Sequence, residues 1–198
     1  MVATDSTAKK TKKSSSTELS ENNPNLRTPP HNLTMEQAVL AALMTVAESW
    51  ESVADILLEN EFYATRHRHI FRAIKSLADS NQPYDAVMVN DWLTNQHMLE
   101  DAGGEAYLMQ LLAESPPSLF NLPAYAEKVK ETATLRNMIS VGNEILRTAY
   151  DPKGQSVRDI LDRAETNIFS LAEQHNNRQS QSGPQSISDV TAKVVTKL

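Results

Sequence analysis

Two histidines and three arginines lie close together in the stretch FYATRHRHIFRAIKSL, residues 62–77. His67 and His69 are residue types that bind metal ions, and clustered arginines are typical of nucleic-acid patches. On a helix, residues two positions apart point about 200° apart, whereas a helical metal pair needs i, i+4 spacing. The spacing therefore predicts that these two imidazoles do not share a metal ion.

Helical periodicity gives the two histidines different environments. His67 shares a face with four apolar residues, Ile70, Phe71, Ile74 and Leu77. We expect His67 at the edge of the core, bonded to backbone near the start of its helix. His69 falls on the polar side with Arg66 and Arg72. The stretch is therefore interpreted as a structural element, with a nucleic-acid patch as the alternative.

Other patterns that could support catalysis are weak. A motor ATPase needs a phosphate-binding loop of the form GxxxxGK[ST]. No glycine in the chain begins this pattern; the five are Gly103, Gly104, Gly142, Gly154 and Gly183. Asp159, Asp162 and Glu165 follow the spacing of a solvated helix face. We expect no catalytic residue, no cofactor and no metal here, and a small metal-dependent hydrolase is the weakest alternative.

Charge is unevenly distributed along the 198 residues. Residues 1–30 carry five bases against three acids, a net +2, and the remainder carries fourteen bases against twenty-two acids, a net −8. An acidic body is a poor phosphate binder, because DNA affinity depends on clustered lysine and arginine. The absence of cysteine excludes disulfides and thiolate metal sites. The folded part is therefore expected to bind protein more readily than nucleic acid.

The elements that must position these residues are helices. Glycine is scarce and helix formers dominate, which predicts an all-α chain: a small helical bundle, then an antiparallel helical hairpin and a linker helix. Residues 1–28 are polar and are expected to be a disordered tail. Residues 29–117 are expected to form the globular domain. Within it, Thr34 and Gln37 have capping-box spacing, a short helix is expected near 51–58, and Asp85 is expected to cap a later helix.

Residues 118–176 predict the hairpin. Apolar residues recur at helical spacing before and after DPKG, residues 151–154, which is a turn sequence, and Ser156 with Asp159 restarts the helix. A lone hairpin has apolar surface left over, so we expect it to pair with a second copy or a partner; folding back onto the globular part is the alternative. The candidate hairpin and dimer contacts are Leu122, Tyr125, Val129, Met138, Ile139, Ile145, Val157, Ile160, Leu161, Ile168 and Phe169.

The C-terminal part predicts a linker and a docking helix. Residues 177–186 are polar and contain the Gly183–Pro184 pair, typical of a flexible linker. Residues 187–198 then begin an amphipathic helix that ends without a stop signal, as if truncated before a further domain. Its docking face is expected to be Ile187, Val190, Val194 and Leu198.

Five stretches, taken in order and spacing, resemble the N-terminal domain of the DnaB-type bacterial replicative DNA helicases. They are PPHNLTMEQAVLAAL, EFYATRHRHIFRAI (residues 61–74), QPYDAVMVNDWLTNQHMLEDAGG, GGEAYLMQLLAESPPS (103–118) and NLPAYAEKVKETATLRNMI (121–139). The resemblance covers roughly residues 29–198. The Lys-rich tail departs from the family pattern, which leaves its role open.

The resemblance implies a role in assembly at the bacterial replication fork. In this family the hairpins pair between subunits, and six N-terminal domains form a collar, a trimer of dimers. The collar recruits the C-terminal domain of primase, and a helicase loader acts near the linker. ATP, Mg²⁺ and DNA would be bound by the motor of the longer protein, in the cytoplasm and without a membrane. An independent helical DNA-binding regulator is the rival hypothesis.

Overall fold

Helices account for every regular element of the part of the chain that the structure describes, which confirms the predicted all-α class. The computed structural model describes residues 28–46, 48–114 and 121–182. The elements are α2 (Leu33–Thr45), η2 (Ser49–Ser52), η3 (Glu59–Glu61), α3 (Thr65–Asp79), α4 (Ala86–Asn95), α5 (Gly104–Glu114), α6 (Leu122–Tyr150) and α7 (Val157–Ser182). Within the described ranges, no helix is long and apolar enough to cross a membrane.

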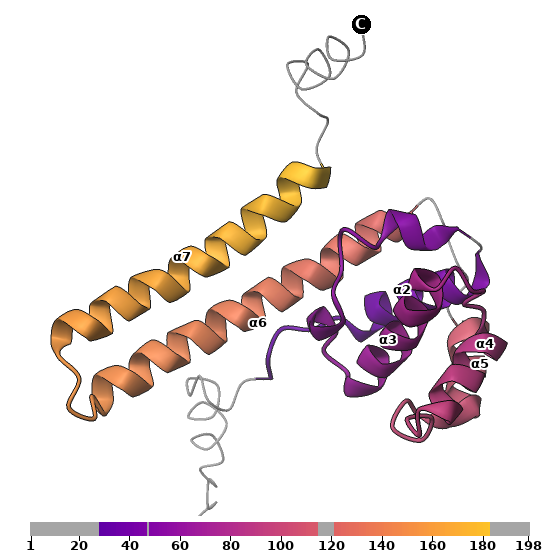
Figure 1. The fold of residues 1–198 in the computed structure, drawn as a ribbon, viewed down its shortest axis with the longest axis horizontal. Coiled ribbons are helices and arrows are strands. Elements are labelled where there is room, and N and C mark those ends of the chain that lie inside the picture. Colours follow the sequence, from indigo (N-terminus) through magenta and orange to yellow (C-terminus); the bar gives the residue numbers. More distant parts are fainter. Residues whose placement is uncertain (1–27, 47, 115–120, 183–198) are drawn as a thin grey trace, which may run out of the picture.

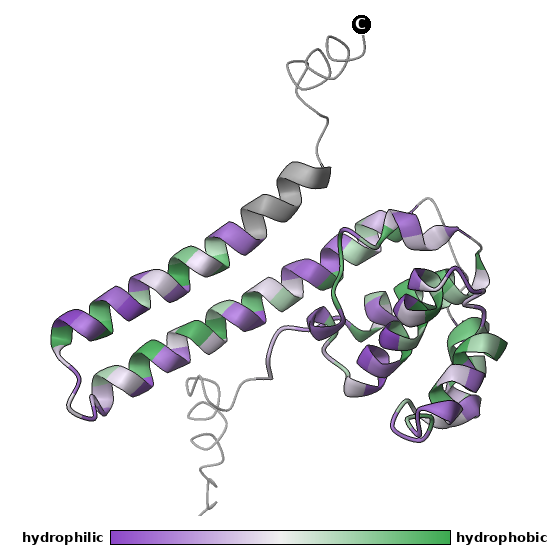
Figure 2. Cartoon of the chain, in the orientation of Figure 1, coloured by the Kyte–Doolittle hydropathy of each residue, from purple (hydrophilic) through white to green (hydrophobic). Residues whose placement is uncertain are grey.

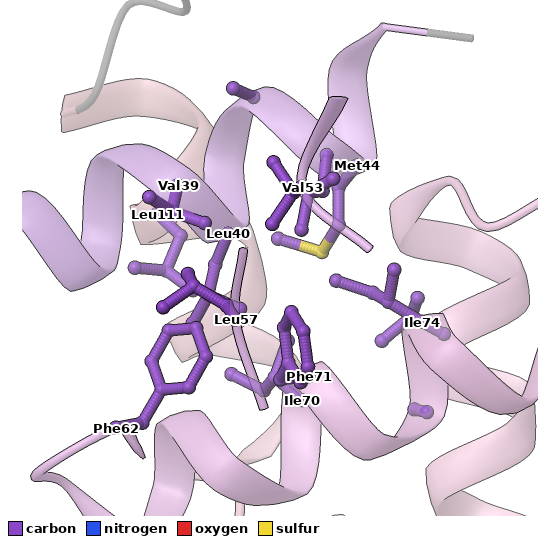
Figure 3. Close-up of a cluster of buried hydrophobic side chains, with 14 of the residues drawn as sticks. Val39, Leu40, Met44, Val53, Leu57, Phe62, Ile70, Phe71, Ile74 and Leu111 are labelled. Carbon is purple, nitrogen blue, oxygen red and sulfur yellow. The ribbon is translucent and has the colours of Figure 1, made fainter. Parts of the chain in front are cut away.

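Helix α2 is the central helix of the bundle. Six consecutive residues, from Val39 to Met44, are buried, because α3, α4, α5 and α6 surround this helix. Figure 3 shows Val39, Leu40 and Met44 of this helix in one apolar cluster with Phe62, Phe71 and Leu111 of α5. The bundle is thus organised around one apolar helix, with Figure 1 showing α4 and α5 on the side away from the hairpin.

The start of α2 differs from the sequence prediction. Asn32, not Thr34, is the N-cap: its side-chain Oδ1 accepts a hydrogen bond from the backbone N–H of Met35 at 3.1 Å. Asparagine and threonine are both favourable N-cap residues, so the sequence allows the helix to begin after either one. In the structure α2 begins at Leu33, which makes Asn32 the N-cap. The predicted cap at Asp85 is confirmed, since its carboxylate accepts from the N–H groups of Val87 and Met88.

The expected short helix near residues 51–58 does not form as an α-helix. The segment between α2 and α3 instead contains the 3-10 turns η2 and η3, joined by irregular backbone. Val53, Ile56 and Leu57 are buried against the core. Their burial stabilises this segment more than the few local hydrogen bonds of the 3-10 turns do. The spacing of these apolar residues therefore reflects their burial against the core and does not indicate an α-helix.

Helices α6 and α7 form the predicted antiparallel hairpin, which extends well beyond the bundle (Figure 1). Asp151 ends α6, and Gly154 adopts a positive φ of 80° in the turn. Ser156 begins α7 with the predicted pairing: its Oγ accepts from the N–H of Asp159, whose carboxylate accepts from the Ser156 hydroxyl at 2.7 Å. The first half of α6 packs on α2, so one helix serves both the bundle and the hairpin.

The predicted linker boundary is wrong at its start. Residues 177–182 continue α7 as helix, so the polar run does not begin a linker at 177. Asparagine, glutamine and serine are polar but do not break a helix, and Gly183 and Pro184 come only afterwards. Residues 183–198, which include the predicted docking face Ile187, Val190, Val194 and Leu198, lie outside the described residues, as does the predicted tail up to residue 27.

Candidate interaction site

The histidine stretch contributes His67 to a buried network of side chains. The Nδ1 of His67 lies 2.6 Å from the Oε2 of Glu36, and its Nε2 lies 2.6 Å from the hydroxyl of Tyr107. The expectation of a backbone-bonded histidine at the core edge was wrong: His67 is completely buried and bridges two side chains. No group of three potential ligands that could hold a metal ion occurs among the described residues.

The arginines of the same stretch make contacts within the bundle. Arg68 donates to the carbonyl of Phe62 at 2.7 Å, and the guanidinium of Arg66 lies 4.0 Å from the centre of the Tyr107 ring. Arg72 forms a paired hydrogen bond with Glu59, which holds the pKa of that carboxyl below its ordinary value. Because these three arginines contact groups of the bundle itself, they are less available to bind phosphates, and this weakens the nucleic-acid alternative.

The eleven candidate hairpin residues fall into three groups in the structure. Leu122 and Val129 are completely buried in the bundle core, and Tyr125 is half-buried against that core. These three therefore anchor α6 to the bundle and do not form a hairpin surface, contrary to the prediction. The reason is that the first three turns of α6 lie against α2, a contact that α6's own periodicity does not reveal.

The second group lies in the seam between α6 and α7. Ile145 and Ile160 are half-buried and approach each other there, beside Ala164. The seam also contains polar contacts, since Glu144 forms an ion pair with Arg163 at 3.2 Å and accepts a hydrogen bond from Asn167 at 3.5 Å. These residues hold the two helices of the hairpin together within one protomer.

The third group is exposed. Its predicted members are Met138 and Ile139 on α6, and Val157, Leu161, Ile168 and Phe169 on α7, which are 45–75% exposed. Figure 2 shows apolar residues recurring along both hairpin helices, outside the bundle. Beside Ile168 and Phe169, a shallow hollow of about 590 Å³ is also lined by Glu165, Thr166 and Ala172. This apolar surface has no cover within the described chain.

The candidate contacts left out three exposed residues of α6: Leu135, Leu146 and Tyr150. Helical spacing could have found them. Leu135 precedes Ile139 by four positions, Leu146 follows it by seven, and Tyr150 follows Leu146 by four, so all lie on one stripe. We call this stripe, together with the third group, the hairpin apolar surface: Leu135, Met138, Ile139, Leu146 and Tyr150 of α6, and Val157, Leu161, Ile168 and Phe169 of α7.

Comparison with known proteins gives consistent matches. Residues 28–131 match the family described as "DnaB-like helicase N terminal domain". The curated relatives include the replicative DNA helicase DnaB of Pasteurella multocida, 36% identical over 170 residues, and the replicative DNA helicase DnaC of Bacillus subtilis, 34% identical over 166 residues. These alignments cover 86% and 84% of this chain. The chain spans only about a third of the length of these relatives.

Solved structures share the fold. The N-terminal domain of DnaB helicase from Mycobacterium tuberculosis superposes with a TM-score of 0.69 at 30% identity, covering 72% of this chain and 99% of that one. A DnaB-like replicative helicase, whose interactions with primase were also studied, superposes with a TM-score of 0.58 at 20% identity. It covers 79% of this chain and 36% of that one, and at this identity it shows the fold alone.

Proposed function

Because this chain belongs to the family of DnaB-like helicase N-terminal domains, we propose that it is an assembly module of a bacterial replicative DNA helicase. In this proposal the hairpin pairs with the hairpin of a second copy. Three such pairs form a collar of six domains. In this role the chain binds other subunits and sets their arrangement, and the catalytic steps belong to the motor of the longer protein.

The hairpin apolar surface is the observation that carries this proposal. Soluble monomers rarely expose apolar patches larger than a few hundred Å². Here large side chains such as Leu146, Leu161 and Phe169 are more than half exposed on two adjacent helices. Burial of a side chain of this size contributes about 1.5–3 kcal/mol, so a few of them on each protomer are enough to drive association.

The elongated shape of the hairpin also fits pairing. Helix α6 has 29 residues, a length of about 43 Å, and only about its first half, up to Arg136, is anchored to the bundle. Two hairpins can therefore lie side by side without contact between their bundles. A two-fold pair of this kind uses the same surface on both copies, which is how closed homodimers form.

Light scattering coupled to size exclusion tests the pairing. The unmodified chain should shift from monomer to dimer or larger as its concentration rises. Leu161→Glu with Ile168→Glu should keep it monomeric, because two charges cannot be buried in the pair. Val87→Glu is the matched control: Val87 is 70% exposed, but lies on α4 in the bundle. A double variant that still associates as the unmodified chain does would overturn the proposal.

The remaining roles follow from the relatives' functions. We propose that the collar binds the C-terminal domain of primase and that a helicase loader acts near the segment following α7. Residues 183–186 would serve as the linker, and Ile187, Val190, Val194 and Leu198 would dock on a neighbouring motor domain. ATP and Mg²⁺ would be bound by that motor, which also contacts DNA in the bacterial cytoplasm. Isothermal titration calorimetry with the purified C-terminal domain of primase tests the first of these contacts. The absence of measurable binding heat would contradict the proposed primase contact.

A further inference from the structure

Lys130 is a buried lysine whose ammonium lacks a hydrogen-bond acceptor. The residue is 4% exposed and lies on α6 between the buried residues Val129 and Ala133. Its Nζ has no hydrogen-bond partner among the described atoms. The nearest paired carboxylate is Glu127, whose Oε1 is 3.8 Å away, at the limit of an ion pair. A buried ammonium without acceptors costs several kcal/mol, so its retention calls for an explanation.

The side chain lines a cavity between α6, α7 and the η3 turn of the bundle. This cavity has a volume of about 40 Å³, and its walls come from the η3 turn (Asn60 and Glu61), α6 (Thr134 and Asn137) and α7 (Gln174). Next to it is a groove of about 350 Å³ that shares Asn60, Asn137, Leu171 and Gln174 and is also lined by Glu144. The Lys130 side chain therefore borders a space that an outside molecule can enter, while its Nζ is itself covered in the free protein.

This site already holds two carboxylates against one ammonium, but the ammonium has no hydrogen-bond acceptor. Glu127 faces Lys130, and the carboxylate of Glu61 also lines the cavity while accepting from the N–H of Leu58 at 2.6 Å. Adding an anion beside two carboxylates would be unfavourable. A neutral carbonyl oxygen would supply the missing acceptor without adding charge. The side-chain amides of Asn60, Asn137 and Gln174 can both donate and accept, which suits the alternating groups of a peptide backbone.

We propose that this groove binds an extended polypeptide segment of a partner protein, with Lys130 donating to one of its main-chain carbonyls. This site lies between the bundle and the hairpin and is separate from the hairpin apolar surface. It does not depend on the pairing of two copies. Because a buried ammonium without an acceptor lowers the stability of the free protein, Lys130 should behave as a binding residue and not as a structural one.

Two variants separate these roles. Lys130→Met keeps the length of the side chain but removes the charge and the donors. Lys128→Met is the matched control, because Lys128 is half exposed on the same helix and pairs with Glu131 at 2.7 Å. If Lys130 is a binding residue, Lys130→Met raises the melting temperature by roughly 3–6 °C, and Lys128→Met leaves it nearly unchanged. A lower melting temperature in Lys130→Met would identify a structural lysine and overturn the proposal.

N-methylacetamide, the smallest mimic of a peptide group, probes the binding itself, with acetate as its charged counterpart. Titrations of the ¹⁵N-labelled full chain are followed by NMR through the lysine ammonium and groove amide signals. We expect saturable shifts confined to the groove with N-methylacetamide, weaker shifts with acetate, loss in Lys130→Met and retention in Lys128→Met. A preference for acetate would make this an anion site instead. Shifts that fail to saturate, or that persist in Lys130→Met, would equally overturn the peptide assignment.

Discussion

The Oε2 of Glu36 lies 2.6 Å from the Nδ1 of His67 at a point where neither side chain reaches solvent. The same carboxylate accepts hydrogen bonds from the backbone N–H groups of Tyr63, at 2.7 Å, and Ala64, at 3.3 Å. On the far side of His67 is the hydroxyl of Tyr107. One carboxylate thus joins α2 to the start of α3 and, through the imidazole, to α5.

Glu36→Ala is expected to lower the free energy of unfolding by about 3–5 kcal/mol, because it leaves two backbone donors and His67 buried without an acceptor. Glu105→Ala, at an exposed acid of α5, is the control and should change it by less than about 0.5 kcal/mol. Urea unfolding followed by the fluorescence of Trp50 and Trp92, both packed against the bundle core, measures the difference. Equal effects of the two variants would show that the network contributes nothing.

Gly103 and Gly104 are expected to differ in their tolerance of alanine. Both have positive φ, of 99° and 75°, but a Cβ on Gly103 would lie 2.9 Å from the Cβ of Tyr107, whereas a Cβ on Gly104 would meet nothing within 4 Å. Gly104→Ala should therefore cost about 1 kcal/mol of unfolding free energy from backbone strain alone. Gly103→Ala should cost at least twice as much, and thermal unfolding of the pair checks the ratio.

Arg136 fastens the start of the described chain to α6. Its guanidinium donates to the carbonyl of Pro30 at 2.9 Å and to the carbonyl of Glu61, and lies 5.6 Å from the centre of the Tyr63 ring. Burial lowers the pKa of Arg136. Arg136→Gln should lower the free energy of unfolding by about 1–3 kcal/mol and expose the backbone near Pro30.

Hydrogen exchange at residues 31–33, compared between the unmodified chain and Arg136→Gln, checks this clamp. Arg147→Gln is the control, since Arg147 lies exposed in the last turn of the same helix. Unchanged protection at residues 31–33 in Arg136→Gln would mean that other contacts, such as the stacking of His31 on Tyr63, hold the segment alone.

The Glu59–Arg72 pair predicts a small acid-dependent contribution to stability. Its main cause is the hydrogen bond from Arg72, which lowers the pKa of Glu59 below its ordinary 4.5. A carboxyl whose pKa is depressed by folding stabilises the fold above pH 4.5 and loses that contribution as the pH falls through its folded-state pKa. Because both side chains are partly exposed, Arg72→Met should cost less than about 1 kcal/mol at pH 7. The cost should vanish near pH 2, as urea unfolding at both pH values would show; an equal loss at both would exclude an electrostatic origin.

The seam of the hairpin should unfold separately from the bundle. Ile160→Ala removes a half-buried contact with α6 and should increase the exchange of α7 amides roughly three- to thirty-fold, for a loss of about 0.7–2 kcal/mol. Val157→Ala is the control: this residue is 75% exposed on the same helix, so the variant should change the exchange of α7 amides little in the monomer. Tryptophan fluorescence should not change, because both tryptophans belong to the bundle. Exchange measured by mass spectrometry at monomeric concentration decides between these outcomes.

Residue types and their spacing were sufficient to predict the elements that depend on neighbouring residues. The turn at Asp151–Gly154, the cap at Ser156 and the cap at Asp85 rest on neighbouring residues, so the chain alone predicted them. The long helix over residues 122–150 has no proline after its first turn, and its periodic apolar residues outweigh its single glycine, Gly142, so it was equally evident. The same reasoning failed at Asn32 and at 51–58, where contact with the core decided which of several permitted local structures formed.

Periodicity marks which residues of a helix are apolar, but not what covers them. Val129, Ile145 and Leu146 follow the same pattern on α6, yet they lie in the core, in the seam and on the exposed surface. Nor did any local signal place Glu36 beside His67, thirty-one positions away, or leave Lys130 buried without an acceptor. The sequence by itself determined the helices, their order and the family. Only the tertiary structure decided how each apolar and charged side chain is used, because burial depends on residues that are distant along the chain and brought together by packing.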